Sequence, residues 1–420
     1  MAIGLAYGLI ASNAGWVDFT NDWVKPFGEV FIKLLKMIAV PLVLVSLIGG
    51  VSSLKDMSSL SKMGSRTIAV YLTTTILAVT IGLIVVNVIK PGESFSESTR
   101  TSLLEKYAAK ASEIQANAEK AQESGPLKFL TDMIPENIFM ASADNLNMLQ
   151  VILFALLFGI GLVLIPEEKS KPVKAFFDGT NDVVLKMVDL IMYFAPIGVF
   201  ALLGSIIVDI TGSNPSAALE ILLALGKYAL TVIIGLLVII LIVYGGIFKL
   251  FVRKISYGSF LKKVAPAQLL AFSTSSSAAT LPLSIERAEE ELGVSNDVVS
   301  FVLPLGATIN MDGTSCYQAV AAVFIAQAFG MDLTLADQAT IVLTATLASI
   351  GSAAVPGAGA IMLAIVLGSI GVPLEGISLI FAIDRPLDMC RTVVNVTGDL
   401  MVTTLIGSTT GKMNVPQTNS

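Results

Sequence analysis

The sequence predicts an all-α polytopic membrane protein, and its composition, its long apolar runs and its lack of alternating strands support that fold class. Of the 420 residues, 54% are hydrophobic and only 14% are charged, and the mean hydropathy is +0.81. Soluble domains carry about 25% charged residues, so this composition indicates an integral membrane protein. The apolar runs are continuous, which favours helices over the alternating strands of a β-barrel.

Five uncharged apolar runs are long enough to cross a hydrocarbon core of about 30 Å. They lie at 37–54, 67–89, 148–166, 191–208 and 228–248. The apolar N-terminal segment is short and lacks a basic region, so we interpret it as part of a first helix rather than a signal peptide. Trp16 and Trp23 after it fit a membrane interface.

Lysine and arginine cluster in three places, after the second, fourth and sixth of the predicted helices, and this bias marks the cytoplasmic side. The clusters are Lys55, Lys62 and Arg66, then Lys169, Lys171 and Lys174, then Lys249, Arg253, Lys254, Lys262 and Lys263. The Ala/Glu/Lys-rich loop 91–130 would then face outward, and its charges are expected to be solvated.

Two segments in the C-terminal half have small residues between apolar arms. The first, 264–285, contains FSTSSSAATLP, and the second, 338–374, contains ASIGSAAVPGAGA. Each resembles two half-helices that meet at a tip, which predicts a re-entrant hairpin. Each is followed by a polar, interrupted segment, so the sequence indicates an internal repeat with a binding site near the membrane midplane.

The segment DRPLDMCRTVVNVTGD at 384–399 places charges in an apolar setting. At about 100° per residue, one helical face collects polar side chains. They are Asp384, Asp388, Arg391, Asn395 and Asp399. Charges at membrane depth cost at least about 2.5 kcal/mol each on insertion scales and usually face a cavity or a partner. The alternative is a buried ion-pair network that only joins helices. The segment has three carboxylates but only two cations, Arg385 and Arg391, and this imbalance favours a binding site.

Arg391 and Asp388 suit a zwitterionic substrate with an acidic side chain. A guanidinium matches a carboxylate in bidentate geometry, and Asp388 could hold an ammonium group. The alternative is that the two residues pair with each other at i, i+3. Ser276 and Ser277, at the first tip, could bind an anionic oxygen or form a plain turn.

Asp312 in NMDGT and Asp399 in NVTGD lie beside Asn, Gly and Thr within interrupted helices. Carboxylate, amide and unwound carbonyl oxygens suit a hard monovalent cation. The structural alternative is that each acid caps a helix locally.

Several classes of function are disfavoured by what the sequence lacks. It contains no histidine, which excludes His-based triads, proton relays and metal sites. A hydrolase that used the serines at 275–277 would therefore have no histidine base, and we expect no enzyme activity. Both cysteines lie in predicted helices, so no disulfide framework is implied. No basic, aromatic-rich cluster suggests a nucleic-acid partner, and the paired hairpins favour a carrier over an ion channel.

Four motifs in order, STSSSAATLP, LPLGATINMDGT, ASIGSAAVPGAG and DMCRTVVNVTGD, resemble those of the glutamate/dicarboxylate–cation symporter family. The resemblance covers nearly the whole chain. It implies eight transmembrane helices, two re-entrant hairpins, inverted repeats, a homotrimer in membrane lipid and an elevator mechanism. Scaffold helices would occupy 1–65 and 131–215, a transport-domain helix 66–90, an extracellular loop 91–130 and a cytoplasmic tail 411–420. The transport domain at 216–410 would contain a helix, a hairpin at 258–292, a broken helix at 295–331, a hairpin at 335–373 and a last helix at 375–410.

The resemblance also implies site residues. The substrate would be bound by Ser276, Ser277, Thr314, Val355, Gly359, Asp388, Arg391, Thr392 and Asn395, with 348–359 as the gate. Up to three sodium ions, and no organic cofactor, are implied. One ion would lie among Gly306, Asn310, Asn395 and Asp399, a second near Thr308, Ser349, Ile350 and Ser352, and a third among Tyr71, Thr74, Thr75, Asn310 and Asp312.

The chain departs from the family pattern in its arginines. Archaeal members have an arginine where this chain has Ser275, and animal acidic amino acid carriers have one at the position of Met389. Arg385 could supply the missing charge near the first tip, or it could pair with Asp384. Gln318 stands where animal carriers have a proton-carrying glutamate, which disfavours proton counter-coupling by that route and leaves potassium counter-transport open.

These observations together predict sodium-coupled symport of L-aspartate and/or L-glutamate by a multi-pass protein of the cell inner membrane. Four aspartates in the predicted site against two arginines leave a net charge of −2, and an acidic substrate makes it −3. Burial of that charge requires cations, so substrate and cation binding should be coupled. A C4-dicarboxylate or proton-coupled glutamate symporter is the alternative, although an amine-free substrate would leave Asp388 unpaired. Neutral substrates are disfavoured by Arg391.

Overall fold

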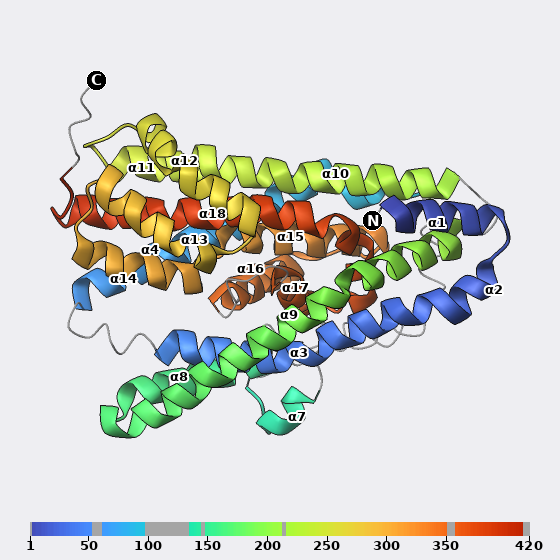
Figure 1. The fold of residues 1–420 in the computed structure, drawn as a ribbon, viewed down its shortest axis with the longest axis horizontal. Helices are drawn as coiled ribbons and strands as arrows, with labels where there is room; N and C mark the ends of the chain where they lie inside the picture. The colour runs from blue at the N-terminus through green and yellow to red at the C-terminus, as the bar shows by residue number, and fades with distance from the viewer. Residues whose placement is uncertain are drawn as a thin grey trace.

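The computed structural model describes residues 2–52, 61–96, 134–143, 148–211, 216–350 and 358–414. Within these ranges the regular structure is helical, and the one β-bridge joins Val294 to Met413. The prediction of an all-α protein is therefore confirmed. Long helices run side by side along the long axis of the molecule (Figure 1).

One group of helices consists of α1, α3, α8 and α9, and α3 packs against both α8 and α9 while α1 packs against α9. Figure 1 shows α3, α8 and α9 as a layer beneath the rest. Their bounds are α1 Ala2–Asn13, α3 Lys25–Ser52, α8 Met148–Leu164 and α9 Glu167–Thr211, and short turns at α2 Val17–Phe19, η1 Thr20–Val24 and α7 Ile138–Ser142 belong with them. We call these helices the α3–α9 group.

Helix α9 is longer than the sequence analysis predicted. The lysines at 169, 171 and 174, which we placed in a loop, lie in its first turns. Glu167 and Glu168 precede them and favour a helix start, because acidic side chains interact well with a helix N-terminus. The helix bends by 55° between Ile191 and Pro196, where the proline removes a backbone donor and crowds the preceding turn.

The second group surrounds α15, in which every residue from Asp312 to Ala326 is buried. Helix α15 packs against α4, α10, α16, α17 and α18. The bounds are α4 Ser61–Ile89, η3 Pro91–Ser94, α10 Ser216–Val238, η5 Ile239–Tyr244, α11 Gly245–Phe251, α12 Tyr257–Thr274, α13 Ser277–Glu286, η6 Arg287–Glu291, α14 Asn296–Ile309, α15 Asp312–Ala328, α16 Leu335–Ile350, α17 Ala358–Ser369, η7 Leu374–Gly376 and α18 Ile377–Thr409. We call these helices the α15 group.

Helices α12 and α13 form a hairpin with a two-residue turn. Ser275 ends α12 in the left-handed region, with φ of 53°. Ser276 is extended, and its hydroxyl accepts a hydrogen bond from the Ala279 N–H at 3.2 Å, which caps α13. The serine-rich tip thus satisfies backbone groups of the helix that it begins. Helices α16 and α17 also pack together, and the residues between them, 351–357, lie outside the described part of the chain.

Helices α14 and α15 are separated by a break at Asn310 and Met311. Asn310 is extended, with φ of −98° and ψ of 99°, and Met311 also leaves helical geometry. The break exposes the last carbonyls of α14 and the first N–H groups of α15 to side chains of neighbouring helices. A polar site can therefore form there.

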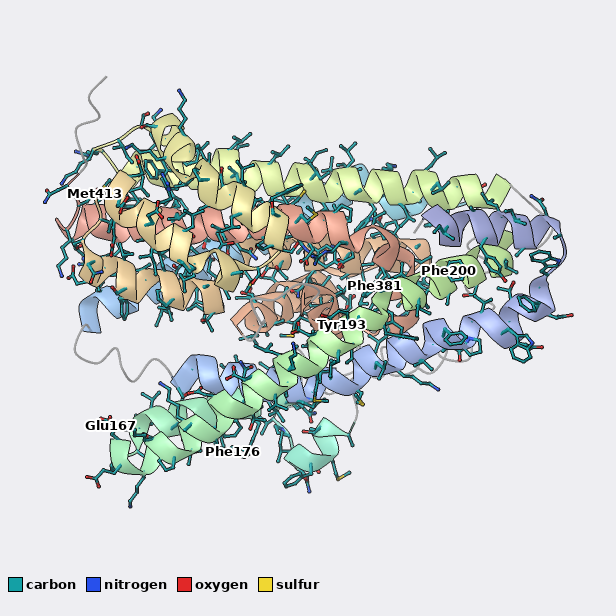
Figure 2. The ribbon with its side chains drawn as sticks, in the orientation of Figure 1. Glu167, Phe176, Tyr193, Phe200, Phe381 and Met413 are labelled. Carbon is teal, nitrogen blue, oxygen red and sulfur yellow. The ribbon has the colours of Figure 1, made fainter. Side chains whose placement is uncertain are left out.

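A short segment after α18, Gly411–Asn414, pairs with the loop that precedes α14, and we call it the C-terminal strap. The Ser295 N–H donates to the Lys412 carbonyl at 3.0 Å, and the Asn414 N–H donates to the Gly293 carbonyl at 2.7 Å. Met413 is fully buried and lies at the end of the molecule where α11 and α18 end (Figure 2). The strap joins α18 to the base of the α12–α13 hairpin.

Two continuous helical segments are long and apolar enough to cross a membrane, Met63–Ser94 and Glu220–Phe251. The bent α9 gives a third candidate if its two parts form one span. Shorter apolar stretches occur at Val40–Gly49 and Gln150–Leu164. The five apolar runs predicted from the sequence all lie in helices, apart from the ends that fall outside the described residues or beyond a helix end.

Candidate functional site

The polar face of α18 is buried in the α15 group. Its five polar residues are each at most 6% exposed although they include four charges. They are Asp384, Asp388, Arg391, Asn395 and Asp399. Burial of so many polar groups requires partners, and these come from α18 itself, from α15 and from the break between α14 and α15.

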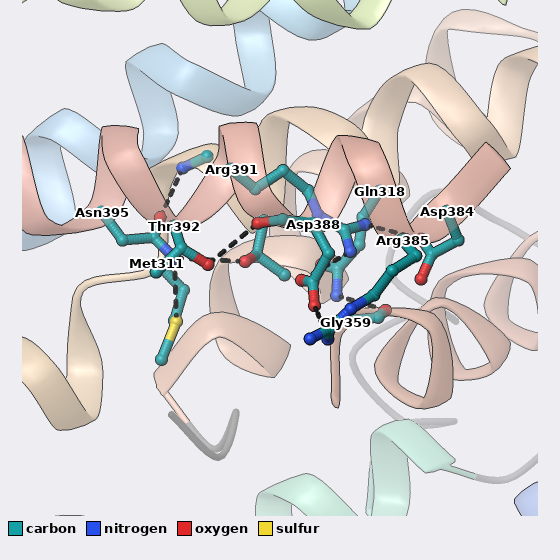
Figure 3. Close-up of polar contacts among 11 residues, drawn as sticks. Met311, Gln318, Gly359, Asp384, Arg385, Asp388, Arg391, Thr392 and Asn395 are labelled. Atoms are coloured by element: carbon teal, nitrogen blue, oxygen red, sulfur yellow. Dashed lines mark hydrogen bonds and ion pairs between the residues drawn. The ribbon is translucent and has the colours of Figure 1, made fainter. Parts of the chain in front are cut away.

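Arg391 is fully buried and held on three sides. Figure 3 shows its contacts with Asp384 and Asp388. Its two terminal nitrogens donate to Asp384 at 3.0 Å and to Asp388 at 2.7 Å. Its guanidinium carbon lies 3.8 Å from the centre of the Tyr317 ring on α15, a cation–π geometry. The internal pairing with Asp388 that the sequence left open is therefore present, and Asp384 adds a second carboxylate.

Arg385 lies near the same cluster but at its edge. Its side chain is 55% exposed, and its guanidinium lies 3.7 Å from the second carboxylate oxygen of Asp388. The alternative that Arg385 pairs with Asp384 is wrong, because Arg385 faces Asp388 instead. Asp384 pairs with Arg391, which lies two helical turns further along α18.

Gly359, near the start of α17, lies against the arginine. A Cβ at this position would be 3.0 Å from the Thr314 methyl and 3.5 Å from an Arg391 nitrogen. The Gln318 amide reaches the Gly359 carbonyl at 3.5 Å (Figure 3). Three predicted binding residues, Gly359, Thr314 and Arg391, therefore meet in the structure. Val355, the fourth residue expected in this region, lies outside the described residues.

Asn395 joins α18 to the start of α15. Its side-chain oxygen accepts from the Gly313 N–H at 2.8 Å. Its side-chain amide nitrogen donates to the Thr314 hydroxyl at 3.3 Å and contacts the Met311 sulfur at 3.2 Å. Thr392 instead donates to the Asp388 carbonyl within α18, at 2.9 Å. The amide of Asn395 thus fixes the helix break next to Arg391.

Asp312, at the start of α15, accepts hydrogen bonds from two other elements. Thr75 of α4 donates to one carboxylate oxygen and Tyr244 of η5 to the other, each at 2.7 Å. The neighbouring Thr74 donates to the Tyr71 carbonyl at 3.0 Å. Of the five residues predicted for one sodium ion, Thr75 and Asp312 are therefore joined directly, and Tyr71 and Thr74 lie on the same helix as Thr75.

Asp399 and Asn310 form a second oxygen-rich cluster. The Asn310 amide donates to Asp399 at 2.8 Å, and a Cβ on Gly306 would clash with Asp399 and with the Tyr71 hydroxyl. The side-chain oxygen of Asn310 is buried and has no hydrogen-bond partner among the described residues. A buried acceptor beside a carboxylate is the donor set that a hard cation prefers, so these residues fit sodium.

The second predicted sodium set, near Thr308 and Ser349, is brought together only in part. The Ser349 hydroxyl lies 3.4 Å from the Ile309 carbonyl, which places the end of α16 beside the end of α14. Thr308 is exposed, and its hydroxyl donates to the Pro304 carbonyl of its own helix. Ile350 is the last residue of α16, and Ser352 lies outside the described residues.

Ser276 and Ser277 lie at the tip of the α12–α13 hairpin, and both are buried. Helix α13 packs against α14 and α18. A role of these serines in substrate binding stays a prediction from the sequence.

Asp384, which the sequence analysis placed on the polar face without a partner, and two tyrosines that it did not assign to the substrate site or to a cation also contribute here. Asp384 had a signal, because its spacing of seven residues from Arg391 places it on the same helical face. Tyr317 and Tyr244 had none, since each looks like an ordinary aromatic residue of an apolar helix. Only the tertiary structure places Tyr317 under Arg391 and Tyr244 on Asp312.

Known proteins resemble the chain over nearly its whole length. A family model described as the sodium:dicarboxylate symporter family matches residues 1–409. The chain is 35% identical over 417 residues to a proton/sodium-glutamate symport protein of Geobacillus stearothermophilus, covering 98% of this chain and 94% of that protein. It is 32% identical to the proton/glutamate-aspartate symporter of Escherichia coli (strain K12), covering 97% and 90%. It is 34% identical to excitatory amino acid transporter 3 of Mus musculus, covering 97% and 83%. The chain belongs to the sodium:dicarboxylate symporter family.

Proposed function

We propose that the protein is a secondary active transporter that carries L-aspartate and/or L-glutamate with sodium across the cell inner membrane. One observation supports this most strongly. A buried arginine, Arg391, lies beside Asp388 and next to two buried carboxylate clusters, around Asp312 and Asp399. The names of the similar proteins, which are glutamate or glutamate–aspartate symporters, point to the same substrate class. A transport role leaves no need for a catalytic one.

Arg391 and Asp388 would recognise the substrate together. The guanidinium would exchange its bond to Asp388 for a bidentate contact with the substrate side-chain carboxylate. The freed Asp388 would then accept from the substrate ammonium group. Asp384 and the Tyr317 ring would keep the guanidinium in place during this exchange. Thr314, Thr392 and Asn395 would add polar contacts, with Ser276 and Ser277 at the α-carboxylate.

Sodium would balance the charge of the occupied site. Four aspartates and two arginines give a net charge of −2 before substrate and −3 with it. A low-dielectric site cannot hold that charge alone, so cation binding must accompany substrate binding. The Asp312 and Asp399 clusters supply carboxylate and amide oxygens for two of up to three sodium ions. Substrate and sodium affinities would then be reciprocally linked.

The two helix groups suggest how transport would occur. We assign the α3–α9 group to a scaffold, at 1–65 and 131–215, and the α15 group to a transport domain, at 66–90 and 216–410. The full protomer would have eight transmembrane helices and two re-entrant hairpins in inverted repeats, and three protomers would form a homotrimer in the lipid bilayer. The transport domain would move as an elevator, and the hairpin at 335–373 would open and close the site.

A C4-dicarboxylate symporter is a second candidate, because Asp388 pairs with two arginines. Asp388 would then keep a cationic partner even when the substrate has no amine. Proton coupling is a further alternative for the ion, since the names of similar proteins include protons as well as sodium.

Equilibrium binding of L-aspartate to the purified protein tests the proposal. Calorimetry over an about hundredfold range of sodium, with choline as the replacing cation, should show an affinity that rises at least about tenfold. The Arg391→Ala variant should lose binding of acidic substrates. An affinity that stays flat across that range would refute the coupling, and binding of succinate alone would move the substrate to the dicarboxylates.

A further inference from the structure

The Asp388 carboxylate lies between two guanidinium groups of very different character. One oxygen is 2.7 Å from Arg391, which is fully buried, and the other is 3.7 Å from Arg385, whose side chain is 55% exposed. Both arginines stand three residues from Asp388 on α18, one on each side. Figure 3 shows Arg385 reaching toward the carboxylate from the side opposite Arg391.

The cluster is electrically neutral without a ligand. Asp384 and Asp388 carry two negative charges, and Arg385 and Arg391 carry two positive charges. An ammonium group that approaches Asp388 must therefore compete with a cation that already faces its outer oxygen. Like charges in a partly desolvated site repel one another, so the two cannot share that oxygen without cost.

The two arginines differ in how easily they can leave. Arg391 is held by Asp384, Asp388 and an aromatic ring, so it stays in the site even when a substrate carboxylate replaces Asp388 as one of its partners. Arg385 has one long contact and a half-exposed, flexible stem, so its pair with Asp388 is weak and can open into solvent. Only Arg385 is suited to move in and out of the site.

We propose that Arg385 is a specificity-determining residue that occupies the position of the substrate ammonium group when that position is empty. It competes with the amine of an acidic amino acid for Asp388. It stays on Asp388 when a dicarboxylate without an amine binds, and so keeps the carboxylate paired. This inference rests on the proposed function, and it means that Arg385 weakens amino acid binding and strengthens dicarboxylate binding at the same site.

The test compares Arg385→Gln with wild type by calorimetric binding of L-aspartate and of succinate at saturating sodium. The variant should bind aspartate about two- to fivefold more tightly and succinate about two- to fivefold more weakly, the range expected for a partly exposed ion pair. Arg385→Lys should behave as wild type. Lys186→Gln on α9, which removes the same charge from an exposed pair with Asp189, should change neither affinity.

The sign of the aspartate effect separates this role from general electrostatics. Loss of a positive charge anywhere near the site would weaken the binding of both anionic ligands, whereas loss of a competing cation strengthens the binding of the amino acid. In an Asp388→Asn background, Arg385→Gln should no longer change succinate affinity. An aspartate affinity that falls or stays constant in Arg385→Gln overturns the inference. A wild-type protein that binds neither ligand in sodium contradicts the proposed function instead.

Discussion

At the residue scale, Arg391 is the side chain that needs most support from its surroundings. A fully buried guanidinium is tolerated because Asp384, Asp388 and the Tyr317 ring surround it. Asp388 has a proposed role with substrate, whereas Asp384 has Arg391 as its one ion-pair partner among the described residues. We therefore regard Asp384 as the positioning residue that keeps the arginine in the site when Asp388 turns to a ligand.

Asp384→Asn tests this positioning role. The substitution leaves a buried cation short of one counter-charge, and such a loss costs about 3–5 kcal/mol. We expect a lower thermal unfolding midpoint in detergent and a weaker affinity for acidic substrates. Asp189→Asn, which breaks the exposed pair with Lys186, is the control and should change little. A variant with the unfolding midpoint of wild type would show that Arg391 does not depend on Asp384.

A second prediction at this scale uses two threonines on α4. Thr75 donates to the Asp312 carboxylate, while Thr73 is exposed and donates to the carbonyl of Ala69 in its own helix. Thr75→Val should therefore weaken sodium binding and lower the free energy of unfolding by about 1.5–3 kcal/mol. Thr73→Val is the same chemical change two residues away and should do neither. If the two variants bind sodium with equal affinity, Asp312 does not belong to the cation site.

At the scale of elements, broken helices bring backbone groups and charges together. The α14–α15 break places Asn310, Asp312 and Gly313 against α18, and the left-handed Ser275 turns α12 into α13. The C-terminal strap holds the base of that hairpin against the end of α18 through backbone hydrogen bonds and the buried Met413. The hairpin and the last helix therefore form one connected unit on this side.

Truncation of the chain tests the strap. A protein that ends at Gly411 loses the buried Met413 side chain and both backbone hydrogen bonds, and it should be less stable by about 2–3 kcal/mol. A protein that ends at Asn414 keeps the strap and is the matched control. Thermal unfolding of both in the same detergent gives the comparison. Equal midpoints would mean that the strap contributes nothing to stability.

At the scale of the whole molecule, the α3–α9 and α15 groups meet through apolar contacts. Phe31 of α3 packs edge-on against Phe381 of α18, with ring centroids 5.0 Å apart. Within the α3–α9 group, a Cβ on Gly198 of α9 would lie 2.5 Å from side-chain carbons of the same Phe31, so this glycine allows α9 to approach α3 closely. Contacts without fixed hydrogen bonds are compatible with one group sliding past the other, as the proposed elevator movement requires.

The sequence predicted the helical class and the polar face of α18, because both are local and periodic. Motif order then indicated the family, which the comparisons confirmed. The sequence did not predict that α9 continues through the lysines at 169–174, since charged residues resemble a loop until the helix start at Glu167 is recognised. It also missed Tyr244, which lies 68 residues from its partner Asp312. Local periodicity carries no information on such distant contacts.

The most direct test of sodium-coupled transport is uptake of radiolabelled L-aspartate into proteoliposomes that contain the purified protein. An inward sodium gradient should drive accumulation, an inward proton gradient without sodium should not, and Arg391→Ala should abolish the sodium-driven uptake. That result would support both the coupling ion and the role of Arg391. Uptake driven by protons alone, with no response to sodium, would contradict the assignment of the Asp312 and Asp399 clusters to sodium.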